Sequence, residues 1–89
     1  MLSKDITLIN ELGLHARPAA QIAKVAATAV SDVWILQDGE QVNAKNILDI
    51  LSLYCPKGAS IRFVVEDAKD STVLDALATL VENGFGELS

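Results

Sequence analysis

The sequence contains one cysteine, Cys55, so no disulfide can form within the chain. A small domain without disulfides depends on its hydrophobic core and suits a reducing compartment. The longest uncharged runs have seven residues, for example residues 25–31, whereas a membrane-spanning helix needs about 20 apolar residues. The first residues include Lys4 and Asp5 and do not form the apolar stretch of a signal peptide. We therefore expect a cytoplasmic protein without a membrane-inserted segment.

Basic residues, aromatic side chains and metal ligands are also scarce. Seven Lys and Arg stand against twelve Asp and Glu, a net charge of -5, so nucleic acid and anionic membranes are poor partners. Aromatic residues make up only 4% of the chain, which argues against base stacking. One histidine, His15, and one cysteine cannot build a zinc site alone. We expect no metal centre, no cofactor and an inert thiol at Cys55.

The hydrophobic pattern predicts a single α+β domain over residues 1–89. Apolar residues in period two predict strands, and apolar residues at 3.6 spacing predict helices. The expected order is βαββαβα, with strands at residues 4–9, 33–36, 40–43 and 61–66 and helices at 18–28, 45–53 and from Asp70 or Ser71 to Asn83-Gly84. Two long helices with apolar stripes favour an open-faced β-sandwich, in which a four-stranded antiparallel sheet is covered on one face by three helices.

The histidine lies in residues 13–20, Gly-Leu-His-Ala-Arg-Pro-Ala-Ala, where a glycine loop becomes a helix. With His15 as the N-cap, the free amides and the positive dipole end of the first turn attract anions. A neutral imidazole can act as a nucleophile, and the planar fork of Arg17 suits phosphate. We predict that His15 accepts a phosphoryl group, held by Ala16, Arg17 and Pro18. The alternative is a solvated histidine beside a surface charge.

A second informative segment is residues 47–53, in which five of seven residues are apolar. A two-turn helix has only one face for the core, so Ile47, Leu48 and Leu51 are expected to be partly exposed. They would then form a docking patch for protein partners near the histidine. The alternative is that all five apolar residues are core. The acidic C-terminal part, with Glu82 and Glu87, is expected to be a solvated end rather than part of a site.

Residues 13–20 resemble the histidine motif of the HPr family, the histidine-containing phosphocarriers of the bacterial phosphoenolpyruvate-dependent phosphotransferase system. The resemblance continues through residues 42–45, 47–53 and 57–59 and covers nearly the whole chain. It implies that His15 is phosphorylated through Nδ1, and that Arg17 and the first-turn amides hold the phosphoryl group. It also implies a four-stranded sheet in the order 1-4-2-3.

The resemblance further implies partners for a covalent carrier rather than for a stand-alone enzyme. Enzyme I would donate the phosphoryl group, and sugar-specific acceptor proteins would receive it. Both would dock on the exposed faces of the first two helices, where the expected contact residues are Ala20, Lys24, Ile47, Leu48 and Leu51. A monomer is expected.

Two residues of this chain differ from the pattern that the resemblance to the family implies. Many Gram-positive members carry a regulatory serine where this chain has Asn46, which has no hydroxyl to phosphorylate. Asp49 places a negative charge on a helix that is more basic in several relatives, and such a change alters partner choice. The C-terminal residues 82–86 are similar to both sugar carriers and the nitrogen-related branch, so the branch stays open.

Three functions are compatible with these residues. The first is a phosphoryl carrier, and the retained His15 and Arg17 favour it. The second is a regulatory module of the same fold that acts by docking alone. The third, a small enzyme acting on a metabolite, is disfavoured because no second catalytic group is evident beside His15 in the sequence.

Overall fold

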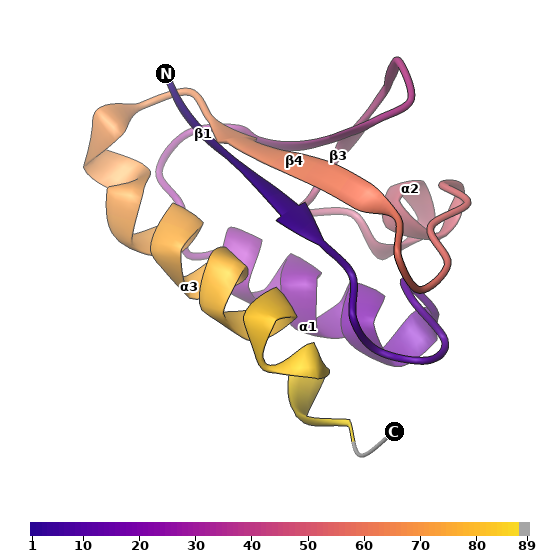
Figure 1. The fold of residues 1–89 in the computed structure, drawn as a ribbon. Helices are drawn as coiled ribbons and strands as arrows, with labels where there is room; N and C mark the ends of the chain where they lie inside the picture. The colour runs from indigo at the N-terminus through magenta and orange to yellow at the C-terminus, as the bar shows by residue number, and fades with distance from the viewer. Residues whose placement is uncertain (88–89) are drawn as a thin grey trace.

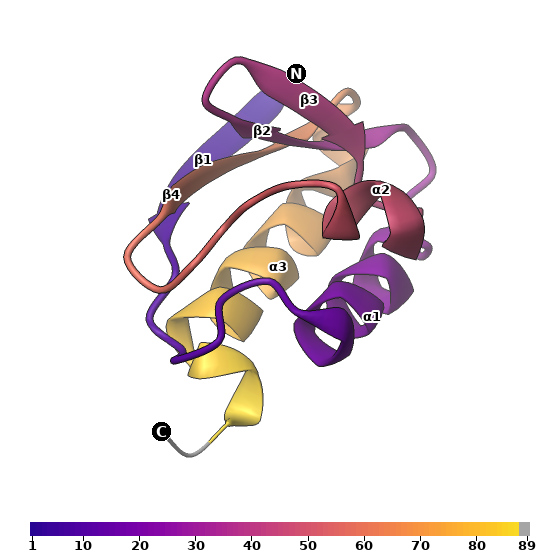
Figure 2. The same ribbon diagram turned by 90° about the vertical axis from the view of Figure 1, so that its right-hand side faces the viewer.

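Four antiparallel strands and three helices form two layers in the computed structural model, which describes residues 1–87 (Figure 1). The strands lie side by side in the order β1-β4-β2-β3, and they are β1 (Leu2–Thr7), β2 (Val33–Gln37), β3 (Glu40–Asn43) and β4 (Ser60–Val65). The helices are α1 (Ala16–Ala26), α2 (Ile47–Leu51) and α3 (Ser71–Glu82). Figure 2 shows all three on the same side of the sheet. The predicted open-faced sandwich, element order and strand order are confirmed.

The tight turn between β2 and β3 follows from its two residues. Asp38 and Gly39 both have positive φ, 49° and 81°, as a two-residue hairpin turn requires. Gln37 and Glu40 then face each other as the first pair of the antiparallel ladder. The predicted hairpin is therefore confirmed at these residues.

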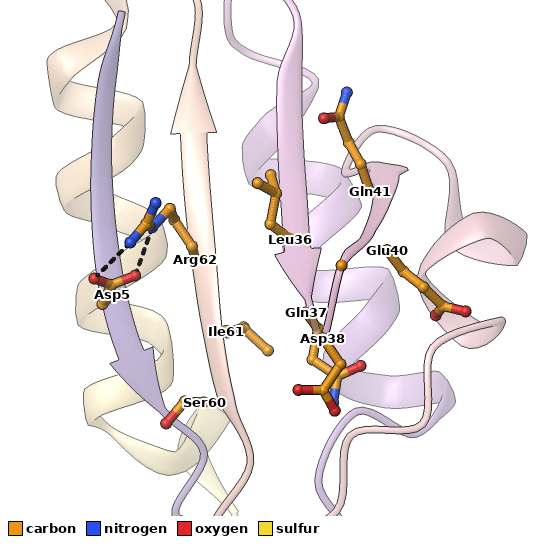
Figure 3. Close-up of a pocket in the computed structure, with 10 residues that line it drawn as sticks. Asp5, Leu36, Gln37, Asp38, Glu40, Gln41, Ser60, Ile61 and Arg62 are labelled. Atoms are coloured by element: carbon orange, nitrogen blue, oxygen red, sulfur yellow. Dashed lines mark hydrogen bonds and ion pairs between the residues drawn. The ribbon is translucent and has the colours of Figure 1, made fainter.

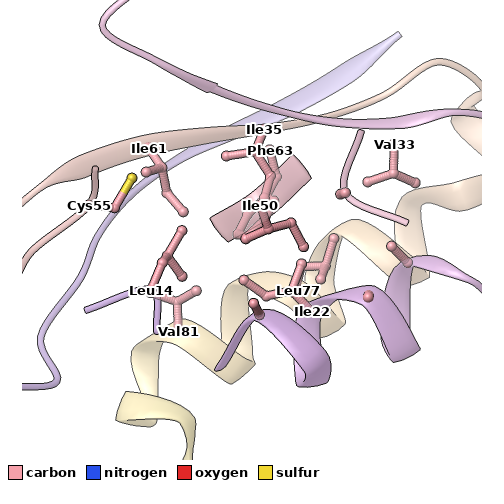
Figure 4. Packing of buried hydrophobic residues seen from close by; sticks show 14 of the residues in the cluster. Leu14, Ile22, Val33, Ile35, Ile50, Cys55, Ile61, Phe63, Leu77 and Val81 are labelled. Atoms are coloured by element: carbon pink, nitrogen blue, oxygen red, sulfur yellow. The ribbon is translucent and has the colours of Figure 1, made fainter. Parts of the chain in front are cut away.

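The core lies between the sheet and the helices (Figure 4). Ile35 and Phe63 point from the sheet toward Ile22 of α1 and Leu77 of α3, and all four side chains are fully buried. The predicted apolar stripe of α1 is confirmed, because the helix buries Pro18, Ala19, Ile22, Ala23 and Ala26. Its small residues let α1 pack against both α2 and α3. This packing fixes the position and direction of the start of α1.

The first two predicted boundaries are shifted in the structure. β1 begins at Leu2 and ends at Thr7, rather than spanning residues 4–9. Leu8 still donates its amide to Ala59 at 2.9 Å and is buried, but the chain then turns toward α1. That helix begins two residues before Pro18, because a proline is tolerated in a first turn, where its missing N–H has no helical partner.

The second helix is shorter than predicted, whereas the third begins where it was predicted to begin. α2 is limited to Ile47–Leu51, because the side chain of Asn46 accepts the amide of Asp49 at 3.2 Å and caps the helix there. Asp70 is the N-cap residue of α3, as predicted, but its side chain makes no capping hydrogen bond. Its carboxylate instead accepts the amides of Val30 and Ser31, which ties α3 to the loop after α1.

The other face of the sheet is uncovered and carries a pocket (Figure 3). Asp5 of β1 and Arg62 of β4 form a forked ion pair across the strands there, at 2.7 Å and 3.2 Å. None of the predicted site residues lines this pocket. Within residues 1–87, no helix has both the length and the apolar character needed to cross a membrane.

Candidate functional site

His15 lies at the junction between a constrained loop and α1. It is the N-cap residue, as predicted, with an extended backbone (φ -91°, ψ -171°). The loop before it is held by Leu14, whose amide donates to the carbonyl of Cys55 at 3.0 Å and whose side chain is buried. The imidazole itself is half-buried. A fixed backbone thus presents one partly accessible imidazole at the start of a helix.

The first turn of α1 provides hydrogen-bond donors that the helix does not use. The His15 side chain makes no capping bond. The first hydrogen bond of the helix runs from the amide of Ala19 to the carbonyl of His15, so the earlier amides of Ala16 and Arg17 have no acceptor within the helix and remain available to an anion. Both residues are exposed. Pro18 differs from the prediction, because it has no N–H and its ring is fully buried. It shapes the turn and cannot donate to a phosphate.

The structure adds a residue that sequence reasoning missed. Glu87 was expected to belong to a solvated end, but its Oε2 lies 2.7 Å from Nε2 of His15. Its Oε1 accepts the side-chain amide of Asn10 at 2.8 Å. The hydrogen bond from Asn10, with further contributions from His15 and the positive charge of Arg17, lowers the pKa of Glu87 below its ordinary value. Glu87 is therefore a carboxylate beside the histidine.

The chain reaches this position through a left-handed turn after α3. Gly84, Phe85 and Gly86 all have positive φ, between 60° and 74°, a conformation that glycine adopts readily and phenylalanine rarely does. The side chain of Phe85 is buried, and its carbonyl accepts the side-chain amide of Gln21 at 3.3 Å. The run Gly-Phe-Gly could have indicated such a turn. No local signal in the sequence, however, shows that the turn brings the Glu87 side chain to His15.

The predicted docking residues lie on the exposed surfaces of α1 and α2. Ala20 and Lys24 are exposed on α1. On α2, Leu48 is 78% exposed, and Ile47 and Leu51 are about half as exposed. Only Ile50 and Leu53 of the apolar residues in 47–53 are buried, so the alternative in which all five are core is wrong.

Apolar side chains in the loops that precede α1 and follow α2 are exposed as well, although they were not among the predicted docking residues. Leu12, in the loop before His15, is 70% exposed, and Tyr54, just after α2, is 81% exposed. Cys55, by contrast, is buried, and burial raises the pKa of its thiol to about 11. A thiol of this kind is unreactive at neutral pH. No cluster of three or more metal-ligating side chains occurs in the described part of the chain.

The chain matches a known protein family over almost its whole length. The model of the PTS-HPr family, described as "PTS HPr component phosphorylation site", matches residues 2–83. The chain belongs to this family. The phosphocarrier protein HPr of Cupriavidus necator is 38% identical over 87 residues, 98% of each chain. That of Neisseria meningitidis serogroup A is 34% identical with the same coverage.

Solved HPr structures have the same fold as this HPr-family chain. HPr-C-His from Thermoanaerobacter tengcongensis superimposes with a TM-score of 0.94 over all of both chains, at 36% identity. A structure of an HPr dimer from the same organism matches with a TM-score of 0.76. The family is that of the phosphocarriers of the bacterial phosphotransferase system, so the resemblance inferred from residues 13–20 is confirmed.

Asn46, at the position where the resemblance implies a regulatory serine in many relatives, has a structural role in this HPr-family chain. The Asn46 side chain is the N-cap of α2. Asp49 lies in the first turn of the same helix, where a negative charge interacts favourably with the helix dipole. Both departures from the family pattern therefore stabilise the start of α2.

Proposed function

We propose that this protein accepts a phosphoryl group from phospho-Enzyme I on Nδ1 of His15 and passes it to sugar-specific acceptor proteins. The observation that carries the proposal is the state of the imidazole. Nε2 is occupied by Glu87, whereas Nδ1 has no hydrogen bond to any of residues 1–87. The nitrogen with the free lone pair is thus the one expected to attack phosphorus.

The start of α1 supplies the phosphate-binding groups. The amides of Ala16 and Arg17 donate from the backbone, and the helix dipole favours the negative charge. The exposed guanidinium of Arg17 adds a charged fork that can bind two phosphoryl oxygens. These groups act on the phosphoryl group and leave the imidazole free to exchange it with a second protein.

The docking surface proposed for Enzyme I and for the acceptors combines α1 and α2. It comprises Ala20, Lys24, Ile47, Leu48 and Leu51, which are all exposed. Packing between α1 and α2 joins the two parts of this surface. We propose a monomer that acts in the cytoplasm, where the unpaired Cys55 is compatible with a reducing environment.

Incubation with Enzyme I and phosphoenolpyruvate, followed by intact mass measurement, tests the function. A carrier gains one acid-labile phosphoryl group, and His15→Ala gains none while it keeps its fold, since the His15 side chain makes no capping hydrogen bond that the substitution could remove. Phosphorylation of the alanine variant would refute the assignment to His15. A wild-type protein that binds Enzyme I but gains no mass would be a docking module. Paired Enzyme I proteins from the sugar and nitrogen branches identify the donor.

A further inference from the structure

We infer that Glu87 is a positioning residue for transfer, which keeps the imidazole proton of His15 on Nε2 and so leaves the lone pair on Nδ1. Asn10 in turn holds the Glu87 carboxylate in place. The inference rests on the proposed function only in that Nδ1 is the reacting atom. It concerns a side chain beyond residues 2–83, the part matched by the family model.

The distance and burial of the pair support a charge-assisted hydrogen bond. The Glu87 and His15 atoms are 2.7 Å apart, and the Glu87 side chain is only 14% exposed. An ionised carboxylate can only accept hydrogen bonds. The lowered pKa keeps Glu87 ionised at neutral pH, so the imidazole nitrogen facing it must carry the proton. The partner of one ring nitrogen thereby decides the state of the other.

Asn10 makes the position of this carboxylate specific. It is 1% exposed, and its Nδ2 donates both to Glu87 and to the carbonyl of Gly13, each at 2.8 Å. Its Oδ1 is buried without a donor among the described residues. Turning the amide over would place that oxygen against a carboxylate and a carbonyl, so only one orientation is favourable. The buried amide therefore directs its two hydrogens at fixed points.

The transfer step shows what the pair contributes. Nδ1 attacks phosphorus, a new N–P bond forms, and the bond from phosphorus to the donor breaks with its electron pair returning to the donor. The ring retains its Nε2 proton and becomes positively charged. The carboxylate of Glu87 stabilises that charge, as a carboxylate does for imidazolium in a catalytic triad. Passing the phosphoryl group on reverses these changes and restores the neutral ring.

Nitrogen-15 NMR of the imidazole tests the tautomer without any phosphoryl transfer. At a pH where His15 is neutral, the wild type should show the Nε2–H tautomer alone. In Glu87→Gln, the new amide can donate to Nε2, so a population with the proton on Nδ1 should appear. Glu82→Gln, at the exposed end of α3, is the matched control and should resemble the wild type. Identical tautomer populations in the wild type and Glu87→Gln would overturn the inference.

Transfer kinetics complete the test. Glu87→Gln and Asn10→Ala should slow phosphoryl transfer about tenfold, a loss of the size expected when a charge-assisted hydrogen bond is removed, with unchanged affinity for Enzyme I. Melting curves verify that each variant is folded. If Asn10→Ala does not fold, the transfer rate of Glu87→Gln alone decides the test. Unchanged rates would overturn the inference. A wild type that never gains a phosphoryl group would refute the proposed function, whereas the tautomer result would still report on the pair.

Discussion

Gly13 lies so close to Cys55 that a Cβ on Gly13 would stand 2.0 Å from the carbonyl oxygen of Cys55. The same carbonyl accepts the amide of Leu14. Gly13 has a φ of 61°, in the left-handed region. The loop before His15 and the loop after α2 are thus in contact through backbone atoms. Only glycine fits this contact, which explains on steric grounds why the residue two positions before His15 is a glycine.

Gly13→Ala should lower stability by about 3 kcal/mol or more, because backbone strain adds to a collision with a carbonyl that cannot move freely. Gly58→Ala is the matched control, since Gly58 also has positive φ (91°) but nothing lies within 4 Å of its added Cβ. Urea unfolding of both variants measures the difference. Equal losses at the two positions would show that the Gly13 contact with Cys55 contributes little.

The parts predicted from the sequence are those encoded by neighbouring residues. The hairpin needed only Asp38-Gly39, and the N-cap position of His15 needed only the order of His15 and Pro18. Glu87 could not be predicted in this way, because it meets His15 across 72 positions of the chain. The sequence likewise predicted only a local capping role for Asp70, whereas its carboxylate binds a loop about 40 residues away in the chain. Contacts of this range depend on packing and leave no periodic signal.

Arg17→Ala should slow phosphoryl transfer about ten- to hundredfold, because charge-assisted bonds to phosphate are lost. Its melting temperature should change little, since Arg17 is exposed. Rapid-quench measurement of transfer from phospho-Enzyme I gives the rate. Lys69→Ala, which removes an exposed positive charge just before α3, controls for the change in net charge. The same rate in both variants would reject a direct role for Arg17.

Asp70→Asn should make stability less dependent on pH in acid. Hydrogen bonds from the Ser31 hydroxyl and the Val30 amide lower the pKa of Asp70 in the folded protein below its ordinary value of 3.8. The stability that this carboxylate adds is therefore complete above that ordinary value and is lost as the pH falls toward the folded pKa. Thermal melts from pH 7 to pH 2 should show a shallower acid decline in Asp70→Asn than in the exposed control Asp32→Asn. Parallel curves would contradict this assignment.

Leu48→Ser should weaken binding to Enzyme I without unfolding the domain. Leu48 is 78% exposed, so the folded protein loses almost no packing when the side chain is shortened. Burying a leucine in an interface contributes about 1.5–3 kcal/mol, which corresponds to roughly a tenfold or greater loss of affinity. A melting curve and a binding titration on the same sample separate the two quantities.

Ile50→Ala provides the opposite case on the same helix. Ile50 is fully buried, and removing a buried isoleucine costs about 2–5 kcal/mol, so its melting temperature should fall while the folded fraction keeps its affinity. The pair therefore assigns one face of α2 to the core and the other to docking. If Leu48→Ser instead melts early and binds normally, the exposed face of α2 is not the docking surface for Enzyme I.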